Sequence, residues 1–278
     1  GKGMGTMTVL FIALGIRAGV GGMERFNQRV ERTLEELRAA GVEHCTVALW
    51  DRTPPAGAPD NPGGRCYHPC ASSKTRAAAA FLMEAARRRP DVILYGHVLV
   101  APLAAAARLL SPRSRNLLFV HGHEVWSEPF RARIAWKDRW PVEHCIDEVV
   151  AVSRLTARRM AAGYRLPETR FRLLPNALDP PASPPPPVNG AGGPPRLLTV
   201  TRLGAKDRYK GCDRVLRALP GVLAEVPEAR YDVVGDGPLR PELERLAEQL
   251  GVRGAVRFLG YVDDGRLDEI YRQARLMV

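Results

Sequence analysis

Short apolar runs alternate along the first part of the chain with longer segments of helical spacing. Apolar runs of strand length lie at residues 9–14, 46–49, 92–95, 117–120 and 149–152. Between the first two runs, apolar residues recur every three or four positions, at Met23, Phe26, Val30, Leu34 and Leu37, which predicts an amphipathic helix. A second helix is predicted over residues 73–89, where it stops before a proline. Strands that alternate with helices indicate βα units around a parallel sheet.

The same alternation restarts after residue 195. Strands are predicted at 196–200, 231–234 and 256–259, and helices from about 213, over 238–250 and over 264–274. Residues 276–278 begin a fourth strand, and no helix follows it. Because a parallel sheet needs helices on both faces, we expect this second domain to be incomplete. An unusually small second lobe is the alternative.

A stretch rich in proline and glycine separates the two halves. Residues 179–195 read DPPASPPPPVNGAGGPP, which can neither pair in a sheet nor continue a helix. We therefore predict a doubly wound α/β domain over residues 1–179, a linker over 180–195 and a second such domain over 196–278.

Composition and charge narrow the classes of protein. The chain has 278 residues, 45% apolar content and a net charge of +11, which suits a globular protein of one or two domains. No apolar run approaches the roughly 18 to 20 residues of a membrane span, and residues 9–14 are too short for a signal-peptide core, so a cytoplasmic location is expected. No recognised nucleic-acid motif accompanies the positive charge, so no nucleic-acid partner is expected.

Most of the excess positive charge lies in the first domain. Residues 131–140, RARIAWKDRW, mix cations and tryptophans in a stretch of helical character, which is typical of interfacial helices. Peripheral contact with the inner face of a membrane is therefore a hypothesis, and an arginine-rich solvated face is its alternative.

The cysteines do not suggest a disulfide framework. They number five, an odd count, and are scattered over the chain, so reduced thiols are expected. The stretch Cys66-Tyr-His-Pro-Cys70 resembles half a zinc site, but no second Cys/His pair at metal spacing follows it. We therefore predict no metal site.

A loop with four cations follows the first strand of the second domain. Residues 201–211 read TRLGAKDRYKG. Ligands of open α/β sheets bind beyond the carboxyl ends of the strands, and the helix that follows offers free N–H groups and a positive dipole end. We expect Arg202 and Lys210 to flank a phosphate or diphosphate there, with Lys206 and Arg208 as solvated loop charges. A wholly solvated basic loop is the alternative.

A glycine-rich loop joins the first strand and helix of the first domain. Residues 15–24 read GIRAGVGGME, and glycines let backbone N–H groups approach an anion closely. A tight turn without a ligand is the alternative. The loop lacks the third glycine of G-x-G-x-x-G, and the chain contains no G-x-x-x-x-G-K-[ST] or G-x-S-x-G, so dehydrogenases, P-loop NTPases and α/β-hydrolases are disfavoured.

A set of short motifs in a fixed order carries a resemblance to a known family. They are GGME at 21–24, VS at 152–153, LPNALD at 174–179, Arg202 with YKG at 209–211, VGDGP at 234–238 and RFLGY at 257–261. Each is weak alone, but together they span almost the whole chain. In this order they resemble glycosyltransferase family four, the group 1 enzymes.

The resemblance implies a GT-B fold, in which two Rossmann-like domains face each other across a cleft. It places the acceptor site mainly in the first domain and the nucleotide-sugar site mainly in the second. It implies a retaining, metal-independent glycosyltransferase that needs no cofactor. Its donor would be a UDP-, GDP- or ADP-linked sugar, and its acceptor a sugar, a lipid-linked glycan or a small molecule.

The same resemblance assigns roles in the second domain. Arg202 and Lys210 would grip the donor diphosphate and stabilise its charge as the nucleotide leaves. The backbone of Phe258 and Leu259 would lie beside the nucleobase. Two glycines would line the floor of the site, Gly235 and Gly237.

In the first domain, Gly21 and Gly22 match the loop that approaches the diphosphate from the other side. His121 follows a predicted strand, where the family commonly has a histidine near the transferred sugar, and a hydrogen bond to a sugar hydroxyl would suit it. The alternatives are a structural histidine, or a metal site with His123 and Glu124.

One departure from the family concerns the end of the sequence. The family carries an E-x(7)-E motif and a closing helix after the strand that begins at Leu276, and neither is present. We expect the chain to hold a diphosphate without completing the donor site. Because fold alone does not define chemistry, a nucleotide-sugar epimerase or phosphorylase, and a non-catalytic nucleotide-binding fragment or pseudoenzyme, remain alternatives.

Overall fold

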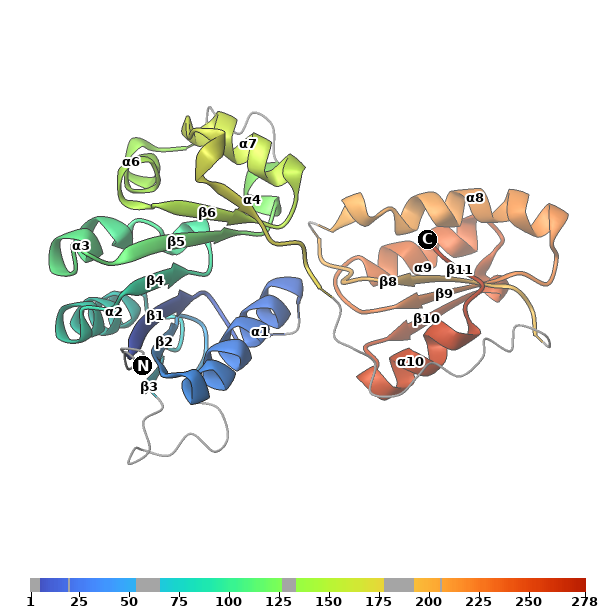
Figure 1. Cartoon of the computed structure of the whole chain (residues 1–278). Coiled ribbons are helices and arrows are strands. Elements are labelled where there is room, and N and C mark those ends of the chain that lie inside the picture. Colours follow the sequence, from blue (N-terminus) through green and yellow to red (C-terminus); the bar gives the residue numbers. More distant parts are fainter. Residues whose placement is uncertain (1–5, 20, 54–65, 127–133, 178–192, 206) are drawn as a thin grey trace. The chain divides into compact units, whose positions relative to one another are not determined.

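The chain forms two compact units, each built on a parallel sheet with helices on both faces (Figure 1). The computed structural model describes residues 6–19, 21–53, 66–126, 134–177, 193–205 and 207–278. Unit 1 is Gly1–Leu178 and unit 2 is Asp179–Val278. Most of the predicted linker, residues 180–192, lies outside the described residues.

Unit 1 contains a seven-stranded sheet in the order β3-β2-β1-β4-β5-β6-β7, and every described pair is parallel. The order reverses between β1 and β4, which is where open α/β sheets bind ligands beyond the strand ends. The strands are β1 (Met7–Ala13), β2 (Val42–Ala48), β3 (Cys66–Pro69), β4 (Val92–Tyr95), β5 (Arg115–Val120), β6 (Glu148–Ala151) and β7 (Phe171–Leu173).

Helices cover both faces of this sheet. The apolar run in β1 explains why: Leu10 and Ile12 are buried toward α2 and α3, whereas Val9 and Phe11 are buried on the face that α1 covers. The helices are α1 (Gly22–Glu36), α2 (Lys74–Arg88), α3 (Leu103–Leu110), α4 (His123–Trp126), α6 (Trp136–Cys145) and α7 (Arg154–Tyr164), with 3₁₀ turns η1 (Leu37–Ala40), η2 (Val98–Val100) and η3 (Glu168–Arg170).

Unit 2 contains a four-stranded parallel sheet in the order β10-β9-β8-β11. Leu216 and Leu243 are buried on one face, and Ile270 packs against Leu198 on the other. The elements are β8 (Arg196–Val200), η4 (Arg208–Lys210), α8 (Cys212–Glu225), β9 (Arg230–Val234), α9 (Arg240–Gln249), η5 (Arg253–Ala255), β10 (Val256–Gly260), α10 (Asp264–Gln273) and β11 (Leu276–Met277).

The predicted α/β class with parallel sheets is confirmed, and some elements differ from the prediction. β3 and β7 were not predicted, because both are short and carry polar residues. The α-helix of α1 ends at Glu36 and continues as a 3₁₀ turn to Gly41, which has the left-handed φ of 87°. No helix in the described part of the chain is both long and apolar enough to cross a membrane.

The expectation of reduced thiols is wrong for Cys45 and Cys66. Cys45 and Cys66 form a disulfide although 21 positions separate them, because the parallel register of β2 and β3 places them directly opposite each other. The remaining cysteines are buried free thiols: Cys70, Cys145 and Cys212.

Candidate functional site

The loop after β8 is held by backbone hydrogen bonds on both sides of Arg202. The Thr201 N–H donates to the Val234 carbonyl at 2.9 Å, and the Leu203 N–H donates to the Asp236 carbonyl at 3.0 Å. The Arg202 side chain itself is exposed. The sequence thus places this guanidinium on a defined piece of backbone at the carboxyl end of a parallel strand.

Two glycines let this loop lie directly on the end of β9. Gly235 has a φ of 122°, and a Cβ there would overlap the Thr201 carbonyl. Gly237 has a φ of 149°, and a Cβ there would lie 2.5 Å from the Leu203 carbonyl oxygen. L side chains rarely adopt these backbone conformations. Gly235 and Gly237 therefore support the loop that carries Arg202.

The cations of the loop differ in their partners. Arg208 is exposed, as expected of a solvated loop charge, and it also forms a surface ion pair with Glu242 through both carboxylate oxygens, Nη1 to Oε1 at 2.8 Å. This hydrogen bond holds the pKa of Glu242 below its usual value. Within the described residues, neither Arg202 nor Lys210 has a carboxylate partner, and Lys206 lies outside them.

The start of α8 lies directly after this loop. Gly211 has the left-handed φ of 79° and makes no side-chain cap hydrogen bond to the helix. The first N–H groups of a helix have no acceptor within it, and its N-terminus carries partial positive charge. With Arg202 and Lys210, this end of unit 2 offers two cations and helix amides to an anion.

A bulge in β10 leaves one residue out of the strand register. Phe258 pairs with Val233 and Gly260 pairs with Val234, so the ladder skips Leu259. The Phe258 carbonyl accepts from Arg240 Nη2 at 3.2 Å, and the Gly260 carbonyl accepts from the Gly235 N–H at 2.7 Å. The backbone of Phe258 and Leu259 was expected to lie beside a nucleobase. The Phe258 carbonyl already accepts from a protein donor, and Leu259 has no partner residue in the strand register.

In unit 1, the glycine-rich loop folds around a carboxylate that sequence reasoning missed. Asp51 is buried and accepts hydrogen bonds at 3.1 Å from the N–H groups of Ile16, Arg17 and Ala18. Tyr67 Oη also donates to it at 2.6 Å. Burial, with the adjacent Asp51, raises the pKa of Tyr67, so the phenol keeps its proton. These amides are thus occupied by the protein's own anion.

The amides that remain for an external anion belong to the start of α1. Gly21 is the extended N-cap residue and makes no side-chain cap hydrogen bond. A Cβ on Gly21 would lie 2.5 Å from Glu24 Oε2, whereas a Cβ on Gly22 would meet nothing within 4 Å. The Glu24 carboxylate therefore folds back toward Gly21, one of the two glycines expected to approach a diphosphate.

His121 directly follows β5, and one of its ring nitrogens is hydrogen-bonded to the backbone. Its Nε2 is 2.9 Å from the Gly96 carbonyl oxygen, which can only accept, so Nε2 carries the proton. The His121 N–H donates to Glu124 Oε1 at 2.9 Å, and the ring packs edge-on against Phe26. Nδ1 is then the ring nitrogen that can accept a hydrogen bond from a hydroxyl. The metal alternative needs the His123 side chain, which lies outside the described residues.

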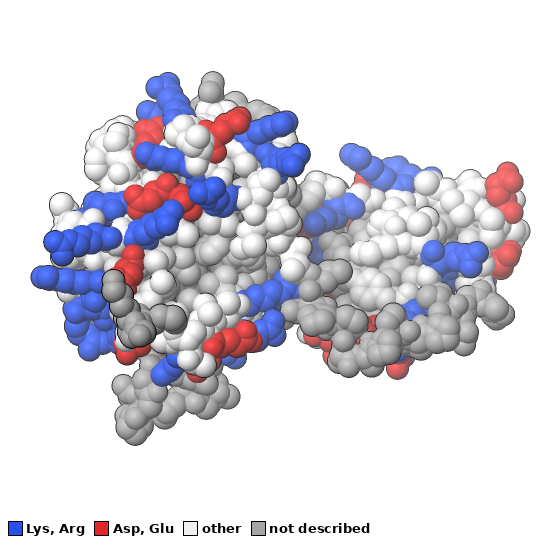
Figure 2. Space-filling view, in the orientation of Figure 1, with Lys and Arg blue, Asp and Glu red and all other residues white. Residues whose placement is uncertain are grey.

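The basic surface of unit 1 is partly balanced by acidic groups. Figure 2 shows Lys and Arg side chains over α2, α3 and α7, with acidic side chains between them. Residues 131–133 of the proposed interfacial stretch lie outside the described residues. In the part that is described, Trp136 is 71% exposed and Trp140 is 39% exposed, so both indoles reach the surface.

Comparison with known proteins identifies related sequences and folds. A GDP-mannose-dependent alpha-(1-6)-phosphatidylinositol monomannoside mannosyltransferase of Mycolicibacterium smegmatis is 33% identical over 170 residues, which cover 56% of this chain and 43% of that protein. The chain thus spans less than half the length of that relative. Among solved structures, the apo form of the lipopolysaccharide outer core galactosyltransferase WaaB matches this chain with a TM-score of 0.63 at 16% identity. Anabaena HepE in complex with UDP and glucose matches it with a TM-score of 0.59 at 17% identity. Each covers 98% of this chain and 73% of the other chain.

Two family descriptions match the two halves in order. Residues 187–278 match glycosyl transferases group 1, and residues 20–181, more than half of the chain, match Glycosyltransferase Family 4. The family and fold expected from the ordered motifs are thereby confirmed. The chain belongs to glycosyltransferase family 4 and has the two-sheet α/β fold of the GT-B glycosyltransferases.

Proposed function

We propose that the protein containing this chain transfers a glycosyl unit from a nucleotide diphosphate sugar to an acceptor hydroxyl, with retention of anomeric configuration. The observation that carries the proposal is the contrast among the loop cations of unit 2. Arg208 is neutralised by Glu242, whereas Arg202 and Lys210 have no carboxylate partner in the part of the chain that the structure describes. Cations that lack a described carboxylate partner, at the carboxyl end of a parallel strand, suit a diphosphate; the Lys210 ammonium lies 5.0 Å from the centroid of the Tyr209 ring.

The proposal gives residues of each half a separate role. Arg202, Lys210 and the N-terminus of α8 stabilise the negative charge that develops as the nucleoside diphosphate leaves. The backbone at Leu259 lies beside the nucleobase. From unit 1, the start of α1 at Gly21 and Gly22 contacts the diphosphate, and His121 Nδ1 accepts a hydrogen bond from a hydroxyl of the transferred sugar. The proposal assigns the charge stabilisation to two cations and helix amides, without a metal ion or cofactor.

The donor and acceptor are proposed from the relatives. The mannosyltransferase that is 33% identical is named for GDP-mannose and for a phosphatidylinositol mannoside, and the HepE structure contains UDP and glucose. We therefore propose GDP-mannose as the first donor to test, UDP-glucose as the second, and a lipid-linked glycan as the acceptor class.

A lipid-linked acceptor gives a reason for contact with a membrane surface. Exposed Trp136 and Trp140 on α6 support peripheral contact at the inner face of the membrane. Sedimentation with vesicles tests this proposal. Stronger retention on anionic than on neutral vesicles is expected, and equal retention on both, or none on either, would contradict it.

The experiment that tests the proposed reaction is product analysis. The protein is incubated with each sugar nucleotide, with and without an acceptor glycolipid, and the anomeric configuration of the product is determined by NMR. The proposal predicts an α-linked product from an α-linked donor, formed only with acceptor present. An inverted linkage would contradict retention. A changed sugar nucleotide without acceptor would instead indicate an epimerase, and donor binding without turnover would indicate a non-catalytic protein.

A further inference from the structure

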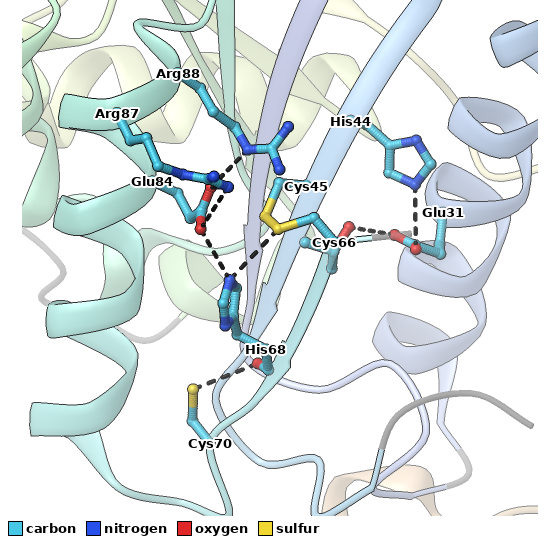
Figure 3. The surroundings of a disulfide bond; sticks show 10 residues. Glu31, His44, Cys45, Cys66, His68, Cys70, Glu84, Arg87 and Arg88 are labelled. Atoms are coloured by element: carbon cyan, nitrogen blue, oxygen red, sulfur yellow. Dashed lines mark hydrogen bonds and ion pairs between the residues drawn. A yellow bond between two sulfur atoms is a disulfide. The ribbon is translucent and has the colours of Figure 1, made fainter. Parts of the chain in front are cut away.

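Four side chains with metal-binding chemistry converge on the face of the unit 1 sheet that α2 covers (Figure 3). They are Cys45 from β2, Cys66 and His68 from β3, and Glu84 from α2. Each offers one ligand atom, and these atoms all lie within 4.8 Å of one another. None of the four belongs to the proposed transfer site.

The topology explains why residues so far apart in sequence meet. The parallel register places Cys45 opposite Cys66, and because alternate side chains of a strand share a face, His68 points the same way as Cys66. Phe81 and Ala85 of α2 are buried in the core on this face. Their burial presents the intervening Glu84 to β3, where it is only 2% exposed.

Two of the distances, both from His68, already suit a tetrahedral zinc ion, and the two sulfurs can separate to ligand spacing only when the disulfide is reduced. His68 Nε2 lies 3.4 Å from Cys66 Sγ and 3.3 Å from Glu84 Oε1. Bonds of about 2.3 Å to sulfur and about 2.0 Å to nitrogen or oxygen imply ligand atoms roughly 3.3 to 3.8 Å apart in a tetrahedron. Thiolate, imidazole and carboxylate are also the ligand types that zinc prefers. The histidine thus already stands at ligand distance from both neighbours.

Glu84 is oriented by partners outside the cluster. Its Oε2 accepts from Arg88 Nε at 2.6 Å and from Arg87 Nη2 at 3.0 Å. Its Oε1 lies 3.3 Å from His68 Nε2 and also accepts from Arg87 Nη2 at 3.3 Å. Such outer partners orient the ligands of metal sites. Zinc with two thiolates, one carboxylate and a neutral imidazole has a net charge of −1, which the two arginines offset.

We propose that Cys45, Cys66, His68 and Glu84 bind one Zn²⁺ when the Cys45–Cys66 disulfide is reduced, and that formation of the disulfide excludes the metal. A dithiol reductant supplies the two electrons and two protons that convert the disulfide into two thiols, and it becomes a disulfide itself. Zn²⁺ then displaces the two thiol protons, and no electron moves in that step. The structure shows the oxidised state.

The site would couple the redox state of Cys45 and Cys66 to the stability of the sheet edge at β3. β3 is a four-residue edge strand whose only described strand partner is β2. In the oxidised state the disulfide joins these two strands, and in the reduced state the metal joins both strands to α2. Reducing compartments keep such cysteines as thiols, so the metal replaces a cross-link that would otherwise be lost. Metal binding then contributes directly to folding stability.

Metal content measured in both redox states tests the proposal. The protein is divided into an untreated sample and a sample reduced with a phosphine, and each is incubated with Zn²⁺, desalted under argon and analysed by elemental mass spectrometry. We expect about one zinc per reduced chain and none per oxidised chain. With Co²⁺ in place of zinc, the reduced protein should show the absorption bands of a tetrahedral, thiolate-ligated site. A reduced, folded protein without stoichiometric zinc would overturn the proposal, as would equal zinc in both states.

Variants identify the ligands. Cys66→Ser should abolish stoichiometric zinc, and His68→Ala should lower the apparent zinc affinity by roughly tenfold or more. Cys145→Ser is the matched control, because it removes a buried cysteine of the same unit outside the cluster. Circular dichroism reports whether each variant folds, and the comparison of redox states in the unmodified protein holds even if a variant does not. Unchanged zinc binding in His68→Ala would also contradict the assigned ligand set.

Discussion

Gly235 lies directly against the carbonyl oxygen of Thr201, with no space between them for a Cβ. The Thr201 N–H in turn donates to the Val234 carbonyl, so the end of β9 and the loop after β8 are joined backbone to backbone. Arg202 follows immediately, and its position depends on this contact. Gly235 thus supports the loop that carries Arg202.

The first prediction concerns this contact. Gly235→Ala should lower the free energy of unfolding by about 2–4 kcal/mol, because the new Cβ strains a φ of 122° and displaces the Thr201 carbonyl. Gly221→Ala is the matched control: this exposed position in α8 has nothing within 4 Å of a new Cβ, and alanine should add about 0.5–1 kcal/mol there. Urea unfolding measures both. Equal stability of Gly235→Ala and the unmodified protein would show that the loop adapts freely.

The second prediction concerns the carboxylate inside the glycine-rich loop. Asp51→Asn replaces an acceptor with an NH₂ group that faces N–H donors, so the free energy of unfolding should fall by about 2–3 kcal/mol. Tyr67→Phe removes only one of the hydrogen bonds to Asp51 and should cost about 1 kcal/mol. Urea unfolding again measures both. A larger loss in Tyr67→Phe than in Asp51→Asn would contradict the role given to the carboxylate.

The third prediction separates the two nitrogens of His121. His121→Gln can still donate to the Gly96 carbonyl but lacks an acceptor at the Nδ1 position. Its stability should stay close to that of the unmodified protein, while kcat/KM falls by roughly tenfold, the value of one lost hydrogen bond. His121→Asn should show the opposite bias, with lower stability and more activity retained. If activity simply follows stability in both variants, the histidine is structural.

The fourth prediction concerns the thiols. Burial raises the pKa of Cys70, Cys145 and Cys212, so the reactive thiolate is scarcer at pH 8 than in an exposed cysteine. The folded, oxidised protein should therefore resist iodoacetamide. After mild reduction, mass spectrometry of peptides should find the first adduct at Cys66, which is partly exposed. Rapid labelling of Cys212 in the folded protein would contradict its burial.

The sequence predicted most of the strands for a simple physical reason. A strand buried on both faces must be apolar throughout, so β4, over Val92–Tyr95, was predicted with its true bounds. β3 was missed because an edge strand of four residues with a histidine and a proline has no such pattern. Arg202 and Lys210 were predicted to flank a phosphate because they follow a strand. Asp51 was not singled out, because in the sequence it looks like any acidic residue in a loop. Its role depends on how the glycine-rich loop folds around it.

The cysteines show the limit of spacing arguments. Cys66 and Cys70 looked like half of a metal site because they are close in sequence. In the structure Cys70 Sγ faces the His68 carbonyl at 3.4 Å, and the cluster instead takes Cys45 from the neighbouring strand and Glu84 from α2. Sheet register and helix packing bring these residues together, and neither can be predicted from the spacing of cysteines in the sequence.

The central claim is that Arg202 and Lys210 hold the donor diphosphate, and donor affinity tests it most directly. Binding of GDP-mannose and UDP-glucose to the protein containing this chain is measured by calorimetry for Arg202→Ala, Lys210→Ala and the control Arg217→Ala, which removes an exposed charge from α8. Each loop variant should lose about 10- to 100-fold in donor affinity, the value of hydrogen bonds to a charged group, while the control is unchanged. Full donor affinity in a folded double variant of Arg202 and Lys210 would contradict the account.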